Sequence, residues 1–324
     1  MRKRKALCMG TPIRALILDY GKVVLLSKLA ETRGLFIANS IVRFDYGNSL
    51  FEGSECSVSG SVFYNCVLSE DIQPKDFVII EDERSALQFI CEENRERLRD
   101  VDLSNMDLSG FNLSEVNLEN AQLGDTQFRS TDLRSAKFEA AQLQSGVLKG
   151  ANLERATFVR ANITRADFSD TNSLAASFYS AKAREADFTN ANLSYSMFAE
   201  SDLRDANLTY AKLYLSNLSR TNAEYAIFLK ANLNLANLKG ANLQYANLQD
   251  ANLQDARLNG ANLCDANLQD ADLSGADLSG ADLREANLQG ARFGGAIYTP
   301  TTQGLSSIQK ADMYAYPDEP TSEF

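Results

Sequence analysis

The 324-residue sequence contains no histidine and no tryptophan. Without histidine, the chain offers no imidazole to act as a general base, as a metal ligand or as the partner of a nucleophilic serine or cysteine. Positive charge is also scarce, because 32 Lys and Arg stand against 43 Asp and Glu and leave a net charge of −11. Nucleic-acid binding depends on contacts between basic side chains and phosphates, so direct nucleic-acid binding is disfavoured.

Cysteine is infrequent, and no two cysteines have the CxxC spacing of a zinc or redox motif. An odd number of scattered cysteines is typical of free thiols in a reducing compartment, so we expect a cytoplasmic protein without metal or cofactor. No apolar run reaches the 18 or more residues that a membrane-spanning helix requires, so we expect no membrane partner. The five cysteines are Cys8, Cys56, Cys66, Cys91 and Cys264.

What the sequence has in abundance is one motif of five residues, as in "ANLQDANLQDARLNGANLCDANLQDADLSG" at 246–275. Stepping by five from Leu248 meets a large apolar residue at almost every step between residues 101 and 300, a span of 40 pentads. Alanine usually stands two positions before this central residue, with Asn or Asp between them. The central residue is small at only three positions, which are Ser173, Ala183 and Ala223.

A period of five fits neither a helix nor a flat strand. Large residues five apart move around a helix without forming a stripe, and an odd period alternates between the two faces of a strand. The pattern instead predicts short extended segments joined by a turn about every five residues, with Asn, Asp and Gly serving the turns. Coils built this way would stack at strand spacing and hydrogen-bond to their neighbours.

The tandem motif A(D/N)LXX resembles the pentapeptide repeat family. The resemblance implies an all-β, right-handed quadrilateral parallel β-helix with four pentads per coil, and so about ten coils between 101 and 300. Residues 20 apart should then stack, which predicts two opposite aromatic columns with the small central residues beside them, as close packing requires. One column comprises Phe138, Phe158, Phe178 and Phe198, and the other comprises Phe128, Phe168, Phe188 and Phe228.

The segments that flank the repeats predict caps, because a solenoid exposes strand edges at both ends. Residues 81–100 have the pattern of a capping helix that runs into the first coil. Residues 301–324 are expected to form a C-terminal cap and tail, in which Ile308, Met313 and Tyr314 fold over the last coil.

Residues 1–80 are predicted to form a small β-rich N-terminal region, with strand-like runs at "RALILDYGKVVLL" and "DFVIIED". Five-residue spacing over residues 56–68 suggests one or two degenerate coils there. The stretch "IRALILDYGKVV" also resembles the first motif of haloacid-dehalogenase-like phosphatases, in which Asp19 would be the nucleophile. Gly21 stands where that family has a second acid, and the chain before the repeats is too short for its α/β domain, so this enzymatic alternative is weak.

Acidic residues gather in 246–285, where eight acidic and two basic side chains give a net charge of −6 over two coils. Some pentapeptide repeat proteins mimic DNA and bind type II topoisomerases, and this density is close to that of B-DNA, one charge per ~1.7 Å. Calcium binding is disfavoured because the acids are spread over four sides. The proposed acidic face comprises Asp250, Asp255, Asp265, Asp270 and Glu285.

The last residue of each pentad should point outward at a corner. Tyr195, Leu215 and Leu235 therefore form an apolar column with Tyr214 beside it, and Tyr225 and Tyr245 are expected to stack on the next side. Exposed apolar side chains in a cluster are typical of contact surfaces, although they could also pack against the N-terminal region of the same chain.

These observations predict a non-catalytic solenoid that serves as a protein-interaction surface or scaffold, because no set of residues forms a reaction site. The main alternative is a DNA-mimicking regulator that binds topoisomerases. A protein partner is expected in the first case. Members of the resembled family sometimes dimerise through a terminal coil, so a homodimer is also open.

Overall fold

The computed structural model describes residues 98–315 and, before them, the backbone of six short strands. The chain divides into two compact units, residues 1–96 and residues 97–324. Most of the capping helix expected at 81–100 lies outside the described residues. Residues 98–100 are described and are not helical, because Arg99 and Asp100 form the turn that opens the first coil.

The N-terminal unit contains a mostly parallel sheet with the strand order β2-β4-β6-β5-β3, and β1 pairs antiparallel with β6. The first part of β6 pairs with β4 and its last part pairs with β5. The strands are β1 (Arg4–Ala6), β2 (Ala15–Leu18), β3 (Val23–Leu25), β4 (Leu35–Ala38), β5 (Ile41–Arg43) and β6 (Val62–Leu68).

The degenerate pentad coil expected at 56–68 is wrong, because β6 runs without interruption through seven residues. A pentad coil requires a turn between Phe63 and Leu68, and the sequence VFYNCVL is instead rich in the aromatic and β-branched residues that favour a continuous strand. Asp19 and the "DFVIIED" segment lie outside the described residues.

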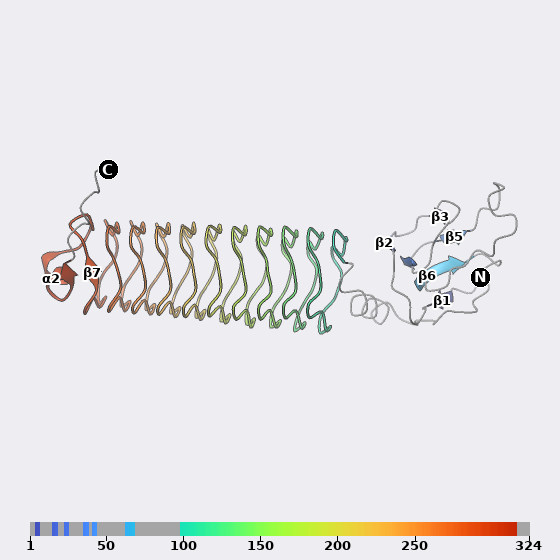
Figure 1. The fold of residues 1–324 in the computed structure, drawn as a ribbon, viewed down its shortest axis with the longest axis horizontal. Coiled ribbons are helices and arrows are strands. Elements are labelled where there is room, and N and C mark those ends of the chain that lie inside the picture. Colours follow the sequence, from blue (N-terminus) through green and yellow to red (C-terminus); the bar gives the residue numbers. More distant parts are fainter. Residues whose placement is uncertain are drawn as a thin grey trace, which may run out of the picture. The chain divides into compact units, whose positions relative to one another are not determined.

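Four pentads make each coil of the second unit, as the repeat predicts. The residue before each centre forms a parallel bridge with the residue 20 positions later, as in Asn222 with Asn242 and Asn242 with Asn262. The N–H of each central residue donates to the carbonyl oxygen 19 positions later, and for Leu243 and Asn262 the distance is 2.7 Å. The coils therefore stack in a regular row (Figure 1).

A tight turn joins each pentad to the next. The N–H of Ala246 donates to the carbonyl oxygen of Leu243 at 3.0 Å, and the intervening Tyr245 has a φ of 59°. A positive φ at the third residue is what a type II turn requires, and Gly, Asn and Asp adopt it most easily. This requirement explains why those residues so often end a pentad, although the same position also carries Leu and Tyr.

Central residues and alanines fill the interior, where almost all have exposed fractions of 0–1%. Two aromatic columns meet inside the coils, as predicted. Phe178 is stacked between Phe158 (5.0 Å between ring centroids) and Phe198 (4.6 Å) and meets Phe168 and Phe188 edge-on at 5.6 and 5.5 Å. The coil that holds Phe168 and Phe178 also holds Ser173 and Ala183, both fully buried, so two small centres accompany two rings.

Asparagines before the central residues form side-chain ladders along the coils. The Nδ2 of Asn242 donates to Oδ1 of Asn222 at 3.1 Å, and the Nδ2 of Asn262 donates to Oδ1 of Asn242 at 3.1 Å. The same Oδ1 of Asn242 accepts the N–H of Gln244, which closes the turn from the side chain. The predicted role of Asn in turns is therefore confirmed, and each ladder adds a link between coils.

A short cap follows the last coil. The bridge from Asp282 reaches Gln303 instead of residue 302, so one extra residue ends the register near Pro300, as predicted. Helix α2 (Ser307–Ala311) begins with a capping box, and β8 (Tyr314–Ala315) pairs with β7 (Ile297–Tyr298). Figure 1 shows α2 and β7 together at this end.

Met313 is buried in this cap, as expected. The backbone N–H of Tyr314 donates to the carbonyl oxygen of Ala296, and its ring lies over Gly295, although the side chain stays 68% exposed. The burial of the Ile308 side chain lies outside what the structure describes.

Replacing Phe178 by leucine should lower the free energy of unfolding by about 2 kcal/mol more than the same change at Phe228, because aromatic pairs contribute ~0.5–1.5 kcal/mol each. Both rings are fully buried, but Phe228 has no aromatic neighbour within residues 98–315. Urea unfolding followed by circular dichroism would compare the two variants. Equal losses would show that the ring contacts add nothing beyond burial.

Replacing Asn242 by alanine should cost about 1–2 kcal/mol more than replacing Asn232, because each net hydrogen bond is worth roughly 0.5–1.5 kcal/mol. Asn232 accepts the N–H of Asn234 at 3.1 Å but has no ladder bond among the described residues. Both asparagines are half-buried, so the difference isolates the ladder. A thermal melt that ranks Asn232→Ala as the less stable variant would contradict this assignment.

Candidate interaction surface

One corner of the central coils carries large apolar side chains in a row. The N–H of Leu215 donates to residue 234 and that of Tyr195 to residue 214, so these residues lie one above another on successive coils. Tyr195 is 52% exposed, Leu215 41% and Leu235 40%. Tyr195 and Tyr214 meet edge-on at 5.6 Å. With Met197 beside them, we call Tyr195, Met197, Tyr214, Leu215 and Leu235 the leucine patch.

Tyr225 and Tyr245 form a second exposed cluster. Their rings stack at 4.8 Å, and their exposed fractions are 52% and 43%. The sequence-based expectation that this pair lies on the side next to the leucine column is wrong. Tyr225 is ten residues, or two pentads, after Leu215, and a coil has four pentads, so the pair occupies the opposite corner.

Sequence analysis missed three exposed apolar residues next to these corners. Met197 (47% exposed) and Ile227 (37%) occupy the position before a central residue, where Asn or Asp usually stands. Tyr210 (51%) shares its corner with Lys230, one coil later, whose Nζ lies 5.8 Å from the centroid of the tyrosine ring. In the sequence, both Met197 and Ile227 could have been recognised as exposed apolar residues, because each replaces the usual Asn or Asp at an outward position. We call Tyr210, Tyr225, Ile227 and Tyr245 the tyrosine patch.

The backbone makes these corner residues costly. Leu215 and Leu235 have φ values of 53° and 58°, and Tyr225 has 60°. The left-handed conformation costs a non-glycine residue roughly 1–2 kcal/mol, and bulky residues there are unusual. The chain thus keeps large apolar side chains where both solvent exposure and backbone geometry oppose them. Such local conflicts are expected at functional sites.

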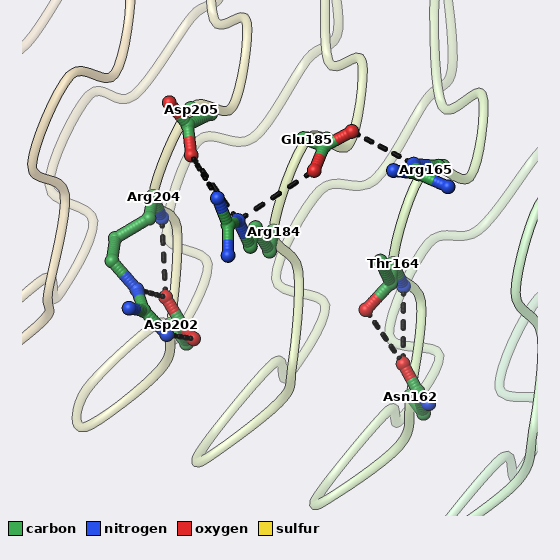
Figure 2. Close-up of polar contacts among 8 residues, drawn as sticks. All are labelled: Asn162, Thr164, Arg165, Arg184, Glu185, Asp202, Arg204 and Asp205. Carbon is green, nitrogen blue, oxygen red and sulfur yellow. Dashed lines mark hydrogen bonds and ion pairs between the residues drawn. The ribbon is translucent and has the colours of Figure 1, made fainter.

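The corner column that contains Tyr225 also contains Arg165, Glu185 and Asp205, and ion pairs neutralise the charges of these three residues. Arg165 bonds Glu185 at 2.7 Å, and Arg184 reaches both Glu185 (3.6 Å) and Asp205 (3.2 Å), as Figure 2 shows. Arg165 lowers the pKa of Glu185 through its hydrogen bond. These side chains are largely exposed, so each pair contributes only ~0–1 kcal/mol to stability.

A separate pair lies beside this network, in which Arg204 bonds Asp202 at 2.6 Å and lowers the pKa of that carboxyl. Figure 2 also shows Asn162 accepting from Thr164 in the turn of an adjacent coil. Beyond Tyr245 the same corner carries Asp265 and Glu285, and neither makes an ion pair with a residue in 98–315. The charge balance of this corner therefore changes from neutral to negative at the tyrosine pair.

The five residues of the proposed acidic face do not share one face. Asp250 and Asp270 are 20 apart and occupy one corner, whereas Asp265 and Glu285 follow Tyr245 on another. Asp255 continues the column of Leu215 and Leu235 on a third corner. Two neighbouring acids are neutralised, because Asp282 bonds Arg284 at 2.6 Å and Asp272 bonds Arg292 at 2.8 Å.

Tyr225 lies in a negative environment. Partial burial raises the pKa of its phenol, and interactions with Tyr245, Glu224, Asp205 and Asp265 raise the pKa further. Glu224 makes no ion pair within residues 98–315. Uncompensated carboxylates thus border the tyrosine patch.

Neither a cluster of metal ligands nor a helix that could cross a membrane is found among the described residues. Among them, no three His, Cys, Asp or Glu side chains come together in a way that could hold an ion. No helix in the described part of the chain has both the length and the apolar character to cross a bilayer. Cys264 is half-buried, and burial raises the pKa of its thiol.

Comparison with known structures gave several similar proteins. HetL from the cyanobacterium Nostoc sp. strain PCC 7120, a pentapeptide repeat protein involved in heterocyst differentiation regulation, is 34% identical, with a TM-score of 0.61 over 64% of this chain and 94% of HetL. The Nostoc protein alr5209 is 35% identical over 31% of this chain and 84% of its own length, with a TM-score of 0.29. The comparison with curated proteins gave no match.

A comparison with protein-family models identifies the repeats directly. The model described as pentapeptide repeats matches in eight copies between residues 97 and 297, among them 97–134, 216–255 and 265–297. Proteins of this kind fold as right-handed quadrilateral β-helices, in agreement with the four pentads per coil observed here. The matches cover more than half of the sequence, so the chain belongs to the pentapeptide repeat family.

Proposed function

We propose that this protein is a non-catalytic scaffold that binds a protein partner through the apolar corners of its central coils. The observation that carries this proposal is the exposure of Leu215 and Leu235, 41% and 40%, in left-handed turns where Gly, Asn or Asp would be easier to hold. Burial of both leucines in a complex would recover apolar transfer energy at ~25 cal/mol per Å² and would account for their retention.

Two further observations support an interaction role. The described residues hold no cluster of His, Cys, Asp or Glu that could bind a metal ion, and the repeats present long regular faces of the kind that solenoids use in binding. HetL, which is involved in heterocyst differentiation regulation, is similar to this chain over 94% of its own length. A role in regulation through binding is consistent with that likeness.

The arrangement of charge supports this function better than DNA mimicry. A DNA-like surface needs unpaired acids in a continuous stripe. In residues 246–285 the proposed acids are divided among three corners, and Asp272 and Asp282 are paired with arginines.

Replacing both Leu215 and Leu235 by asparagine should abolish partner capture without loss of stability. Asparagine accepts the left-handed conformation more easily than leucine, so the melting temperature should stay the same or rise. Affinity capture from a lysate of the source cells, with quantitative mass spectrometry, would compare the variant with the unaltered protein. A partner retained by the unaltered protein and reduced at least about tenfold by the variant is the expected result.

The matched control is Ala175→Asn, which changes an exposed residue of the same corner (φ 56°) outside the leucine patch. This control should capture the same partner as the unaltered protein. Identical captures from all three proteins would show that the leucine patch binds no partner.

A further inference from the structure

The side of the solenoid that carries the tyrosine patch has a charge pattern of its own. This side lies between two corner columns, and in each column tyrosine is followed by an acid. One column carries Tyr225 and Tyr245 directly before Asp265, and the other carries Tyr210 two coils before Asp250. The apolar surface therefore continues into an acidic one on the same side of the coils.

The apolar part of this side extends across a whole pentad. Ile227 and Leu229 occupy both of the positions that flank the buried Phe228, and Ile227 is 37% exposed. No other pentad between residues 101 and 300 has large apolar residues at both of these positions. Tyr225 directly precedes this pentad, and its ring stacks on Tyr245 at 4.8 Å. The surface is thus broader than a single corner column.

Three carboxylates border the same side on the next two coils. Asp250 and Asp270 stand at one corner and Asp265 stands at the other. None of the three makes an ion pair with a residue between 98 and 315. Asp265 is also among the groups that raise the pKa of the Tyr225 phenol, so its field reaches the tyrosine patch.

Two basic residues share these corners, and both are already engaged. The Nζ of Lys230 lies 5.8 Å from the ring centroid of Tyr210, one coil earlier. Arg284 bonds Asp282 at 2.6 Å. The negative charge of the three carboxylates is therefore left for a partner to neutralise.

The surface between the carboxylates is neutral, and its amides bond to neighbouring side chains. The Nδ2 of Asn267 donates to Oδ1 of Asn247 at 3.1 Å, and Nε2 of Gln249 donates to Asp250 at 3.4 Å. The backbone of this side is hydrogen-bonded from coil to coil, so it offers no free edge to an added strand. A partner segment that satisfies its own backbone, as a helix does, suits such a side.

We propose that the tyrosine patch binds a basic amphipathic helix of a protein partner. This inference rests on the proposed function, because it assigns the chemistry of a partner to one of the apolar corners. The apolar side of the helix covers Ile227 and the stacked tyrosines, which serve as aromatic anchors. Lys or Arg side chains on its flanks pair with the three carboxylates, and this complementarity gives the contact its specificity.

A display library of random peptides of about 18 residues, or about five helical turns, tests this class of partner. Peptides selected on the unaltered protein would be sorted by their loss of binding to two variants, Tyr225→Asn/Tyr245→Asn and Leu215→Asn/Leu235→Asn. The peptides lost from the tyrosine variant should have a net positive charge and apolar residues at i, i+3, i+4 and i+7. Asparagine accepts the left-handed corners easily, so the melting temperatures of both variants should not fall.

The leucine patch provides the matched control. Its surroundings carry both signs of charge, because Lys212 and Arg257 are exposed near it as well as Asp255. Peptides that are lost only from the leucine variant should therefore show no preference for positive charge.

The carboxylates provide an independent arm, measured by fluorescence anisotropy with one selected basic peptide. Replacing Asp250, Asp265 and Asp270 together by asparagine should raise the dissociation constant about tenfold. Added salt should weaken binding to the unaltered protein more than binding to this variant. Asp255→Asn, which removes an exposed acid from another corner, should leave the dissociation constant unchanged.

Three outcomes would overturn the proposal. The selection could give no peptide whose binding depends on Tyr225 and Tyr245. The peptides that do depend on them could be neutral or acidic, or could lack the helical spacing of apolar residues. The triple asparagine variant could bind the basic peptide as tightly as the unaltered protein. In each case, a partner protein whose capture depends on Leu215 and Leu235 would leave the proposed function standing.

Discussion

The hydrogen bond from the N–H of each central residue to the carbonyl oxygen 19 positions later is the interaction on which this structure depends. It fixes the coil at four pentads, and it sets each side chain beside its equivalent 20 residues earlier. The rings of the phenylalanine columns and the amides of the asparagine ladders meet only because the backbone has already placed them at strand spacing. In such a fold a surface is a set of columns, and its chemistry is set by which residues share a column.

The coil can close only if every fifth residue adopts a left-handed conformation. This requirement favours Gly, Asn and Asp at the corners, and the chain often follows it, as at Gly240 and Gly260. Other residue types at a corner hold the left-handed conformation at a higher cost, and their contacts show whether that cost is offset. Charged corner residues such as Glu185 gain an arginine partner, and Leu215 and Leu235 gain nothing comparable within residues 98–315. The contact that we propose with another molecule would offset this conformational cost.

The sequence was sufficient for features that depend on the period alone. The five-residue step predicted the coil of four pentads, the two phenylalanine columns and the outward corners, because each follows from counting. The expectation that Tyr225 lies on the side next to Leu215 is wrong because residues ten apart are half a coil apart and face opposite ways. Met197 and Ile227 were missed because the position before the centre was interpreted only as a place for turn formers. The continuous strand β6 was missed because Phe63 and Leu68 imitate the period without the intervening turn.

A solenoid also simplifies the formation of a specific interface. Any two columns share the same axial step, so any two copies with parallel axes already match in spacing, and only the offset between them remains to be specified. Asp255 and Asp265 end the two apolar columns, so each apolar surface extends over only a few coils. The central corners therefore offer a protein partner short apolar columns at a fixed axial step.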